Sequence, residues 1–319
     1  MLTYFLLILG FALLIKGADL LVDGAASLAK KYNISNIAIG LTIVSFGTSS
    51  PELIVSVLAS INGNTDIAIG NVVGSNIVNI LFILGVSAAI YPLVTKSNTI
   101  WKEIPMSLLA ALMMFVLASD HLIDGNNFSM LSRIDGIVLL SFFIIFIYYT
   151  VGISKVETDD SPEIEIPALS SVKSIFFIVL GLAGLVVGGK WIVDGAVHMA
   201  RSLGINESLI GLTIVAVGTS LPELAASAVA AYKKQTDIAI GNVVGSNIFN
   251  IFFILGISSL IKPLPFNQGT AIDVMVACFA SILLFAMLFV GKKHTIEKWQ
   301  GLFMILIYVG YIVFLINTK

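Results

Sequence analysis

The sequence has few charged residues. Only 11% of its 319 residues are charged, whereas 58% are apolar, and the mean hydropathy is +1.03. A soluble domain carries about a quarter charged residues, so a chain this apolar suits a surface that faces lipid. The formal net charge of −2 provides no basic face to neutralise nucleic-acid phosphates. We therefore expect an integral membrane protein with the lipid bilayer as its surroundings and with no nucleic-acid partner.

Cysteine and histidine are also scarce. Cys278 is the single cysteine, and the three histidines are scattered along the chain. One cysteine allows neither an internal disulfide nor a thiolate cluster. This composition disfavours zinc, copper and iron sites, which depend on thiolates or imidazoles. Because no paired nucleophile and base stand out, an intramembrane enzyme is disfavoured as well, and no cofactor is expected.

Long apolar runs are abundant. A spanning helix needs about 20 mainly apolar residues. Ten segments fit this description: residues 2–22, 36–60, 67–90, 103–119, 134–153, 172–193, 207–231, 238–261, 271–290 and 299–316. The first is expected to be a retained span, because no positively charged leader or small-residue cleavage site accompanies it. The predicted fold class is an all-α polytopic membrane protein with ten transmembrane helices.

The basic residues of the loops predict the orientation in the membrane. With the N-terminus outside, eleven loop lysines lie inside and four basic residues lie outside. Because cytoplasmic loops carry the excess of Lys and Arg, both termini are predicted outside. Residues 154–171 then form an acidic cytoplasmic linker, or alternatively a low-affinity cation sensor, although no EF-hand spacing supports that role. The compact, loop-poor chain suggests a prokaryotic plasma membrane.

A duplicated stretch relates the two halves, residues 1–153 and 172–319. Residues 36–93 align with residues 207–264 at a constant offset of 171, and residues 65–77 are identical to residues 236–248. Five spans in each half predict that the two copies have opposite orientations in the membrane. Inverted repeats are typical of secondary transporters, whose ion sites lie at the midplane where the repeats meet.

The first duplicated motif reads GTSSPE at residues 47–52 and GTSLPE at residues 218–223. Glycine and proline within one span predict a broken helix, which is tolerated at membrane depth where it lines a polar cavity. A proline kink alone would explain the backbone. However, a carboxylate at membrane depth costs about 3 kcal/mol or more, and Glu52 and Glu223 occur in register. We therefore predict that both glutamates are functional.

The second motif reads GNVVGSNIVN at residues 70–79 and GNVVGSNIFN at residues 241–250. Ser75 and Asn79 are four residues apart and therefore share one helix face. Gly70 and Gly74 form a small-residue face that predicts close approach of another helix. Packing explains these glycines, but it does not explain three asparagines in each apolar span.

Charged residues and glycines near spans one and six allow two interpretations. Asp19 and Asp23 lie near the end of span one, and Lys190 and Asp194 near the end of span six. Capping or snorkelling at the interface is favoured for them, and a gating or ion-entry role is the alternative. The glycines of these spans suit sliding and close packing equally well; they are Gly17, Gly181, Gly184, Gly188 and Gly189.

Together the two motifs predict a cation site made of hard oxygen ligands. Ca2+ takes about six to eight oxygens, and two carboxylates balance its charge. Hydroxyls and broken-helix carbonyls also suit Na+. The candidate ligands are Glu52, Glu223, Thr48, Thr219, Ser49, Ser220, Ser75, Ser246, Asn79 and Asn250.

These paired motifs resemble the alpha repeats of the calcium/cation antiporter superfamily, most closely its prokaryotic sodium/calcium exchangers. The resemblance implies ten helices with Glu52 and Glu223 as central ligands, serines, threonines and carbonyls completing several cation sites, and spans one and six as the moving pair. Many of these exchangers have aspartate where this chain has Asn250, which leaves the coupling ion and the stoichiometry open. A smaller asymmetry pairs Ser45 with Ala216, near the position of a liganding carbonyl.

The predicted function is antiport of Ca2+ against Na+ by alternating access. An empty site with two ionised glutamates is too costly to move through the membrane, so only loaded states switch. Exchange of protons for Ca2+ through the same glutamates is the alternative. A cation channel is disfavoured by the inverted repeats and the charged, closed site. No obligatory protein partner is expected beside the transported ions.

Overall fold

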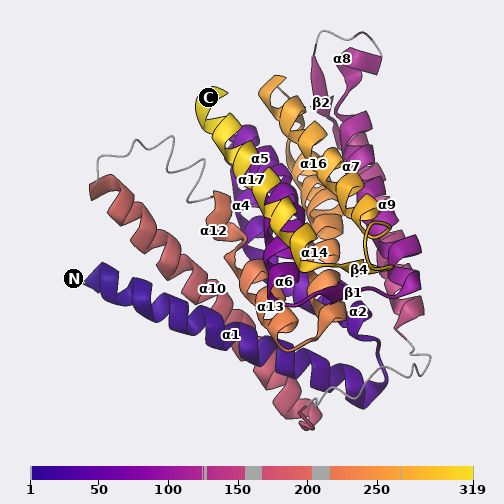
Figure 1. The fold of residues 1–319 in the computed structure, drawn as a ribbon. Coiled ribbons are helices and arrows are strands. Elements are labelled where there is room, and N and C mark those ends of the chain that lie inside the picture. Colours follow the sequence, from indigo (N-terminus) through magenta and orange to yellow (C-terminus); the bar gives the residue numbers. More distant parts are fainter. Residues whose placement is uncertain are drawn as a thin grey trace.

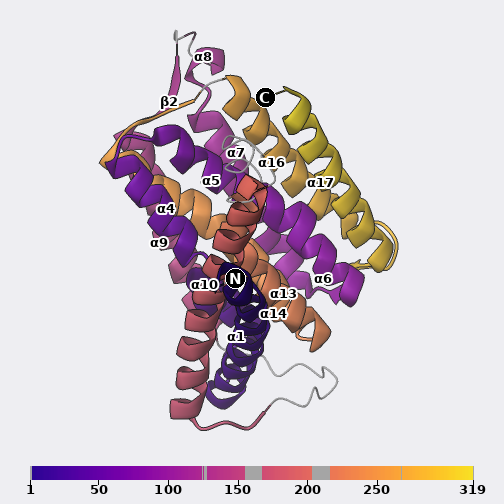
Figure 2. The same ribbon diagram turned by 90° about the vertical axis from the view of Figure 1, so that its left-hand side faces the viewer.

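The structure, a computed structural model, describes residues 2–123, 125, 128–154, 167–202, 216–266 and 268–318. Nearly all of this part is helical. Two long helices, α1 (Leu2–Tyr32) and α10 (Ser171–Ser202), lie side by side and are inclined to a bundle formed by the other long helices (Figures 1 and 2).

The duplicated stretches form the centre of the bundle, in short helices joined end to end. The first copy contains α2 (Asn36–Ile39), η1 (Gly40–Val44), α3 (Ser45–Thr48), α4 (Ser50–Ile61), α5 (Thr65–Ile77), η2 (Val78–Leu84) and α6 (Gly85–Ile90), where η marks π-helical turns. The second copy contains α12 (Ala216–Thr219), α13 (Leu221–Tyr232), α14 (Thr236–Ile248), η5 (Phe249–Leu255) and α15 (Gly256–Ile261). In the continuous helix Thr236–Ile261, 94% of the apolar window is buried.

The remaining helices flank this centre and face outward. They are η3 (Thr99–Glu103) with α7 (Ile104–Leu117), the short α8 (Asp120–Ile123), α9 (Arg133–Ile153), α16 (Gln268–Met287) and α17 (Lys298–Thr318). Only 28% of the apolar window of α9, and of α17, is buried. Their exposed side chains include Ile144, Tyr148 and Leu306, so these helices suit contact with lipid.

Eight described helices are long and apolar enough to cross a membrane, and a bent pair makes a ninth span. The bent pair is Asn36–Thr48 with Ser50–Ile61, which meet at 49°. Nine of the ten predicted spans coincide with these helices. The other, 207–231, begins among residues 203–215, outside the described part, so the predicted count of ten is not tested.

Two short antiparallel ladders accompany the helices, which the all-α prediction omitted. Strand β1 (Leu93–Val94) pairs with β4 (Thr295–Ile296), and β2 (Ser129–Leu131) pairs with β3 (Leu264–Phe266). Each ladder joins a loop of the first half to a loop of the second half. The strands are only two or three residues long, too short to show a strand pattern in the sequence.

The backbones of α1 and α10 touch at several glycines. A Cβ added to Gly10 would lie 2.9 Å from the Gly188 carbonyl oxygen, and one added to Gly17 would lie 2.8 Å from that of Gly181. Real Cβ atoms do not approach backbone atoms this closely. The glycines therefore allow close packing of the two helices, which was one of the two interpretations of their pattern.

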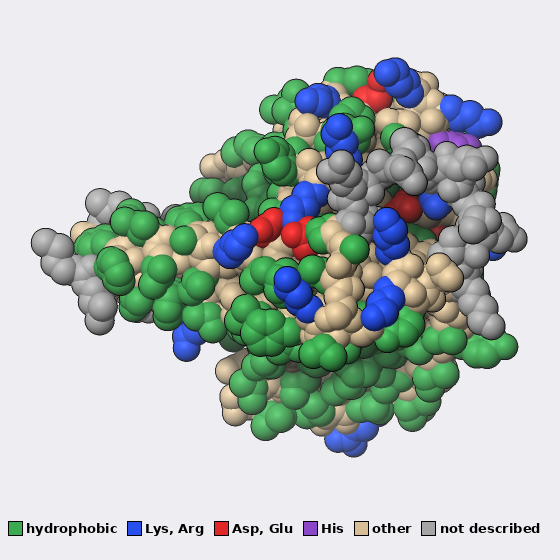
Figure 3. Space-filling view, turned by 90° about the horizontal axis from the view of Figure 1, so that it is seen from below, with side chains coloured by type: hydrophobic (Ala, Val, Ile, Leu, Met, Phe, Trp, Pro, Cys, Tyr) green, Lys and Arg blue, Asp and Glu red, His purple; other side chains and the backbone are tan. Residues whose placement is uncertain are grey.

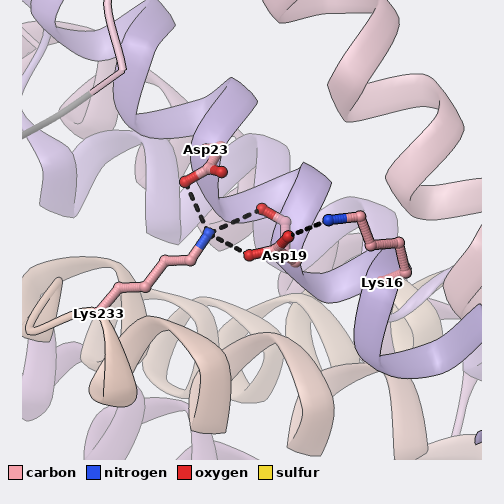
Figure 4. Close-up of polar contacts among 4 residues, drawn as sticks. All are labelled: Lys16, Asp19, Asp23 and Lys233. Carbon is pink, nitrogen blue, oxygen red and sulfur yellow. Dashed lines mark hydrogen bonds and ion pairs between the residues drawn. The ribbon is translucent and has the colours of Figure 1, made fainter. Parts of the chain in front are cut away.

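Charged side chains connect this pair of helices to the bundle. The Lys233 ammonium group, at the end of α13, forms ion pairs with Asp19 and Asp23 of α1, the latter at 2.7 Å (Figure 4). Lys16 approaches Asp19 from the other side, at 2.6 Å. Asp19 and Asp23 therefore bind across a helix contact, which the capping interpretation did not anticipate. Basic side chains surround acidic side chains on the face of the molecule seen from below in Figure 1 (Figure 3).

The close α1–α10 contact makes a stability prediction. The substitution Gly17→Ala should lower the melting temperature of the purified protein, because the added methyl group overlaps the α10 backbone. Overpacking of this kind costs about 1–3 kcal/mol. Gly310→Ala in α17 is the matched control, since the described part places no atom within 4 Å of a Cβ there. Equal melting temperatures for both variants would contradict the contact.

Candidate functional site

The site begins at a break in each duplicated helix. Ser49 separates α3 from α4 with φ −82° and ψ 8°, and Ser220 separates α12 from α13 with φ −87° and ψ 7°. A proline follows in the first turn of each new helix, where its missing N–H has no intrahelical partner to lose. The predicted break at residues 47–50 is confirmed, and its second copy has the same geometry at Ser220.

Each break places a glutamate in the first turn of the following helix. Glu52 in α4 is fully buried, and Glu223 in α13 is 1% exposed. The positive end of a helix dipole favours a carboxylate at this position. Two buried carboxylates also repel each other when both are ionised. A bound cation or a proton would offset the repulsion between the two buried glutamates.

The two halves bind each other through these glutamates. Ser49 of the first half donates a hydrogen bond to Glu223 Oε1 at 2.7 Å. Ser220 of the second half donates to Glu52 Oε1 at 3.2 Å. In both carboxylates the other oxygen, Oε2, is buried and has no hydrogen-bond partner among the described residues. Each glutamate thus has one oxygen held by the opposite half and one oxygen available to a ligand.

The threonines of the first motif also cross between the halves. Thr48 donates to Asn242 Oδ1 of α14 at 3.0 Å, and Thr219 donates to Asn71 Oδ1 of α5 at 3.2 Å. The Thr48 hydroxyl also lies 3.3 Å from the Ser45 backbone carbonyl oxygen, so its proton has two acceptors, of which the Asn242 oxygen is the nearer. The structure thus brings together the four hydroxyls and two carboxylates that the first motif predicted.

The second motif contributes further oxygens. Asn79 donates to Asn247 Oδ1 at 2.9 Å, while its own Oδ1 is buried without a partner in the described part. Asn250 and the Ser246 hydroxyl are likewise buried without described partners. Ser75 differs, because its hydroxyl donates to the Asn71 backbone carbonyl oxygen at 2.5 Å. Buried polar atoms are normally hydrogen-bonded, so the unpartnered oxygens of this motif are available to a ligand with positive charge.

Ser45 and Ala216 have a different role from the side chains above. The Ser45 hydroxyl donates back to the Leu41 carbonyl oxygen at 2.7 Å, within its own helix. The Ser45 carbonyl oxygen accepts from the Ser49 backbone N–H at 2.9 Å, one turn before the break. Ala216 is the first described residue of α12, and the structure gives no contact that connects it to the site.

Sequence analysis left the asparagines behind the glutamates unexplained and missed the serines that they bind. Asn71 donates to Ser56 Oγ at 2.9 Å and to the Glu52 carbonyl oxygen at 3.2 Å. Asn242 makes the corresponding bonds to Ser227 Oγ, at 2.9 Å, and to the Glu223 carbonyl oxygen, at 3.3 Å. A signal was available, because a serine follows each glutamate by four residues in both copies.

The glycine prediction holds for the second copy. A Cβ on Gly245 would lie 2.7 Å from the Leu41 carbonyl oxygen, so α14 packs closely on η1. Around Gly70 and Gly74 the described part has no atom within 4 Å of an added Cβ. The counterpart of Leu41 in the second half lies outside the described residues. Close approach at the first pair is therefore not seen.

The donor set indicates which ligands fit. Among the described residues, no group of three or more His, Cys, Asp or Glu side chains could hold a metal. The site instead combines two carboxylates with hydroxyl and amide oxygens. Hard cations such as Ca2+ and Na+ prefer oxygen ligands of this kind, whereas zinc and copper prefer nitrogen and sulfur.

Comparisons with known proteins agree with this geometry. A family model described as "Sodium/calcium exchanger protein" matches residues 2–152 and 173–317. The putative antiporter CaxA of Alkalimonas amylolytica is 38% identical, with 97% of each chain covered. The sodium/calcium exchanger MaX1 of Methanosarcina acetivorans is 34% identical, with 98% of each chain covered.

A solved structure is similar over nearly the whole length. The sodium-calcium exchanger NCX_Mj, in a crystal soaked with Na+ and Ca2+, superimposes with a TM-score of 0.85. It is 36% identical in sequence, and the match covers 98% of both chains. With the family model matched over both halves and these relatives aligned over their full length, the chain belongs to the sodium/calcium exchanger protein family.

Proposed function

We propose that this protein exchanges Ca2+ for Na+ across a prokaryotic plasma membrane. The observation that carries the proposal is the buried pair Glu52 and Glu223, each with one oxygen bonded to the opposite half and one oxygen unpartnered. Two carboxylates match the charge of one Ca2+ or of two Na+. Family membership supports the same reaction, and full-length relatives occur in bacteria and archaea.

The ligands of this site are the side chains that meet at the two breaks. Glu52 and Glu223 provide the charge, and hydroxyl and amide oxygens complete the shell. The neutral ligands are Thr48, Thr219, Ser49, Ser220, Ser75, Ser246, Asn79 and Asn250. Ser45 and Ala216 contribute through the backbone at the start of each break. Among the neutral ligands, Asn79, Asn250 and Ser246 have the most direct support, because each has a buried oxygen without a partner in the described part.

The architecture behind the reaction is two five-helix halves of opposite orientation. Residues 1–153 form one half, residues 154–171 a cytoplasmic linker and residues 172–319 the other half, with both termini outside. The reciprocal bonds support a twofold relation: Ser49 binds Glu223 as Ser220 binds Glu52, and Thr48 binds Asn242 as Thr219 binds Asn71. Such a relation places one site at the boundary of the halves.

The mechanism follows from the charge of the empty site. Two ionised glutamates in a dry interior are costly to move, so the switch between inward and outward states requires bound Ca2+ or Na+. The α1–α10 unit is the part that moves. Its two helices hold each other through backbone contacts, whereas charged side chains of α1 meet Lys233 of the bundle (Figure 4).

Uptake of 45Ca2+ into proteoliposomes tests the exchange. Vesicles preloaded with Na+ should accumulate Ca2+, and vesicles preloaded with K+ should not, because only the Na+ gradient supplies the driving ion. An imposed pH gradient serves as the third condition. Uptake that follows the pH gradient and ignores Na+ would replace the proposal with proton-coupled exchange.

Removing either carboxylate should weaken Ca2+ binding and abolish exchange. Glu52→Gln and Glu223→Gln each remove one of the two charges, and losing one partner of a buried charged contact costs on the order of 30-fold in affinity or more. Asp66→Asn removes an exposed carboxylate of α5 and should leave binding unchanged. Isothermal titration with Ca2+ measures all three. Unaltered affinity in either glutamine variant would rule that glutamate out as a ligand.

The orientation can be measured with single cysteines. In a Cys278→Ala background, Asn64→Cys should react with an impermeant maleimide added outside intact cells. Ser97→Cys should react only after the membrane is opened, because its loop belongs to the lysine-rich side. Both positions are exposed, so equal access is expected in detergent. The reverse pattern of labelling would invert the proposed topology.

A further inference from the structure

Asn71 and Asn242 occupy equivalent places behind the two glutamates. Each side chain uses its amino group within its own half, on the glutamate backbone carbonyl and on the serine one turn further along the helix. Each uses its carbonyl oxygen on a threonine hydroxyl of the other half. The two amino-group bonds fix which way the amide points, so Oδ1 must face the threonine.

A threonine hydroxyl has one proton, and its direction decides what the oxygen can do. A hydroxyl that has given its proton to an amide offers lone pairs to a cation. Thr219 also lies within reach of the Glu52 carboxylate, and Thr48 within reach of the Glu223 carboxylate. Without the asparagine, the acceptors left for the proton are that carboxylate and, for Thr48, the Ser45 backbone carbonyl oxygen. The harmful case is a proton that turns to the carboxylate. It would then stand between the hydroxyl oxygen and the cation that both oxygens share.

Charge makes asparagine better suited to this place than aspartate. An amide accepts the threonine proton without adding a third negative charge beside Glu52 and Glu223. An aspartate would accept the proton too, but it would lack the amino group that donates to Ser56 or Ser227 and to the glutamate carbonyl. The serines are fully buried, so their oxygens depend on this donor.

We propose that Asn71 and Asn242 are positioning residues of the cation site, each acting through the threonine of the opposite half. Asn71 holds the proton of Thr219 away from the cation, and Asn242 holds that of Thr48. This inference deepens the proposed function and rests on it. It also makes a cross-half rule: each asparagine couples to the threonine of the other copy and not to the threonine of its own copy.

A double-mutant cycle tests the rule through Ca2+ affinity. Asn71→Ala and Thr219→Val are made singly and together in the full chain, and Kd for Ca2+ is measured by isothermal titration in lipid nanodiscs. Each single change should weaken binding about tenfold, the size expected for one hydrogen bond to a charged group. The double variant should lose clearly less affinity than the product of the two single losses, because Asn71 then has no hydroxyl to orient.

Thr48→Val is the matched control within the same cycle. Asn71 has no bond to Thr48, so the effects of Asn71→Ala and Thr48→Val should multiply, to about a hundredfold loss. A purely structural role for Asn71 would give the same dependence on both threonines. Equal coupling to Thr48 and Thr219, or multiplication with both, overturns the proposal.

The mirror cycle keeps the test decisive if one variant fails to fold. Asn242→Ala should couple to Thr48→Val and multiply with Thr219→Val. Melting temperatures of the ion-free proteins check folding. A wild-type protein that binds no Ca2+ would refute the proposed function itself, whereas wild-type binding without the crossed pattern refutes only the positioning role.

Discussion

Everything in this fold depends on keeping two carboxylates buried next to each other. Burial disfavours the ionised form of both Glu52 and Glu223, and no lysine or arginine in the described part of the chain forms an ion pair with either. Instead it offers neutral donors: Ser220 binds one carboxylate and Ser49 the other. Such partners satisfy one oxygen of each glutamate but do not cancel its charge. The remaining charge selects a cation as the natural occupant of the site.

The broken helices solve the same problem at the level of the backbone. A continuous helix would place Glu52 in mid-span, where the neighbouring backbone N–H groups already donate hydrogen bonds within the helix. The break at Ser49 instead starts a new helix, so that Glu52 lies near free N–H groups and the positive end of the dipole. The bend of 49° also turns the new helix relative to the preceding one. The sequence signal for this arrangement, glycine before and proline after the hydroxyls, is local, which is why it could be predicted.

Features that depend on packing between distant segments were harder to predict. Hydropathy located most spans. However, α1 extends to Tyr32, well beyond the predicted end at residue 22, because hydropathy marks the apolar part of a helix and not the end of its hydrogen bonding. The oxygens of the first motif were predicted as ligands from the duplication together with the glutamates in apolar spans. Asn71 and Asn242 were recognised as unexplained polar residues, but their bonds to Thr219 and Thr48 follow from the way the halves face each other. No periodicity within one copy contains that information.

The two copies are similar in sequence, but several of their contacts differ. Asn79 reaches Asn247, whereas the equivalent Asn250 and its neighbour Asn76 leave amide atoms unpartnered in the described part. Lys233 binds Asp19 and Asp23 at one end of α1, while the position equivalent to Lys233 in the first copy is Asn62. A strictly symmetric exchanger would give its two end states equal energy. Residues that differ between the copies remove that equality, so the relative energies of the two end states depend on these positions and not on the shared motifs alone.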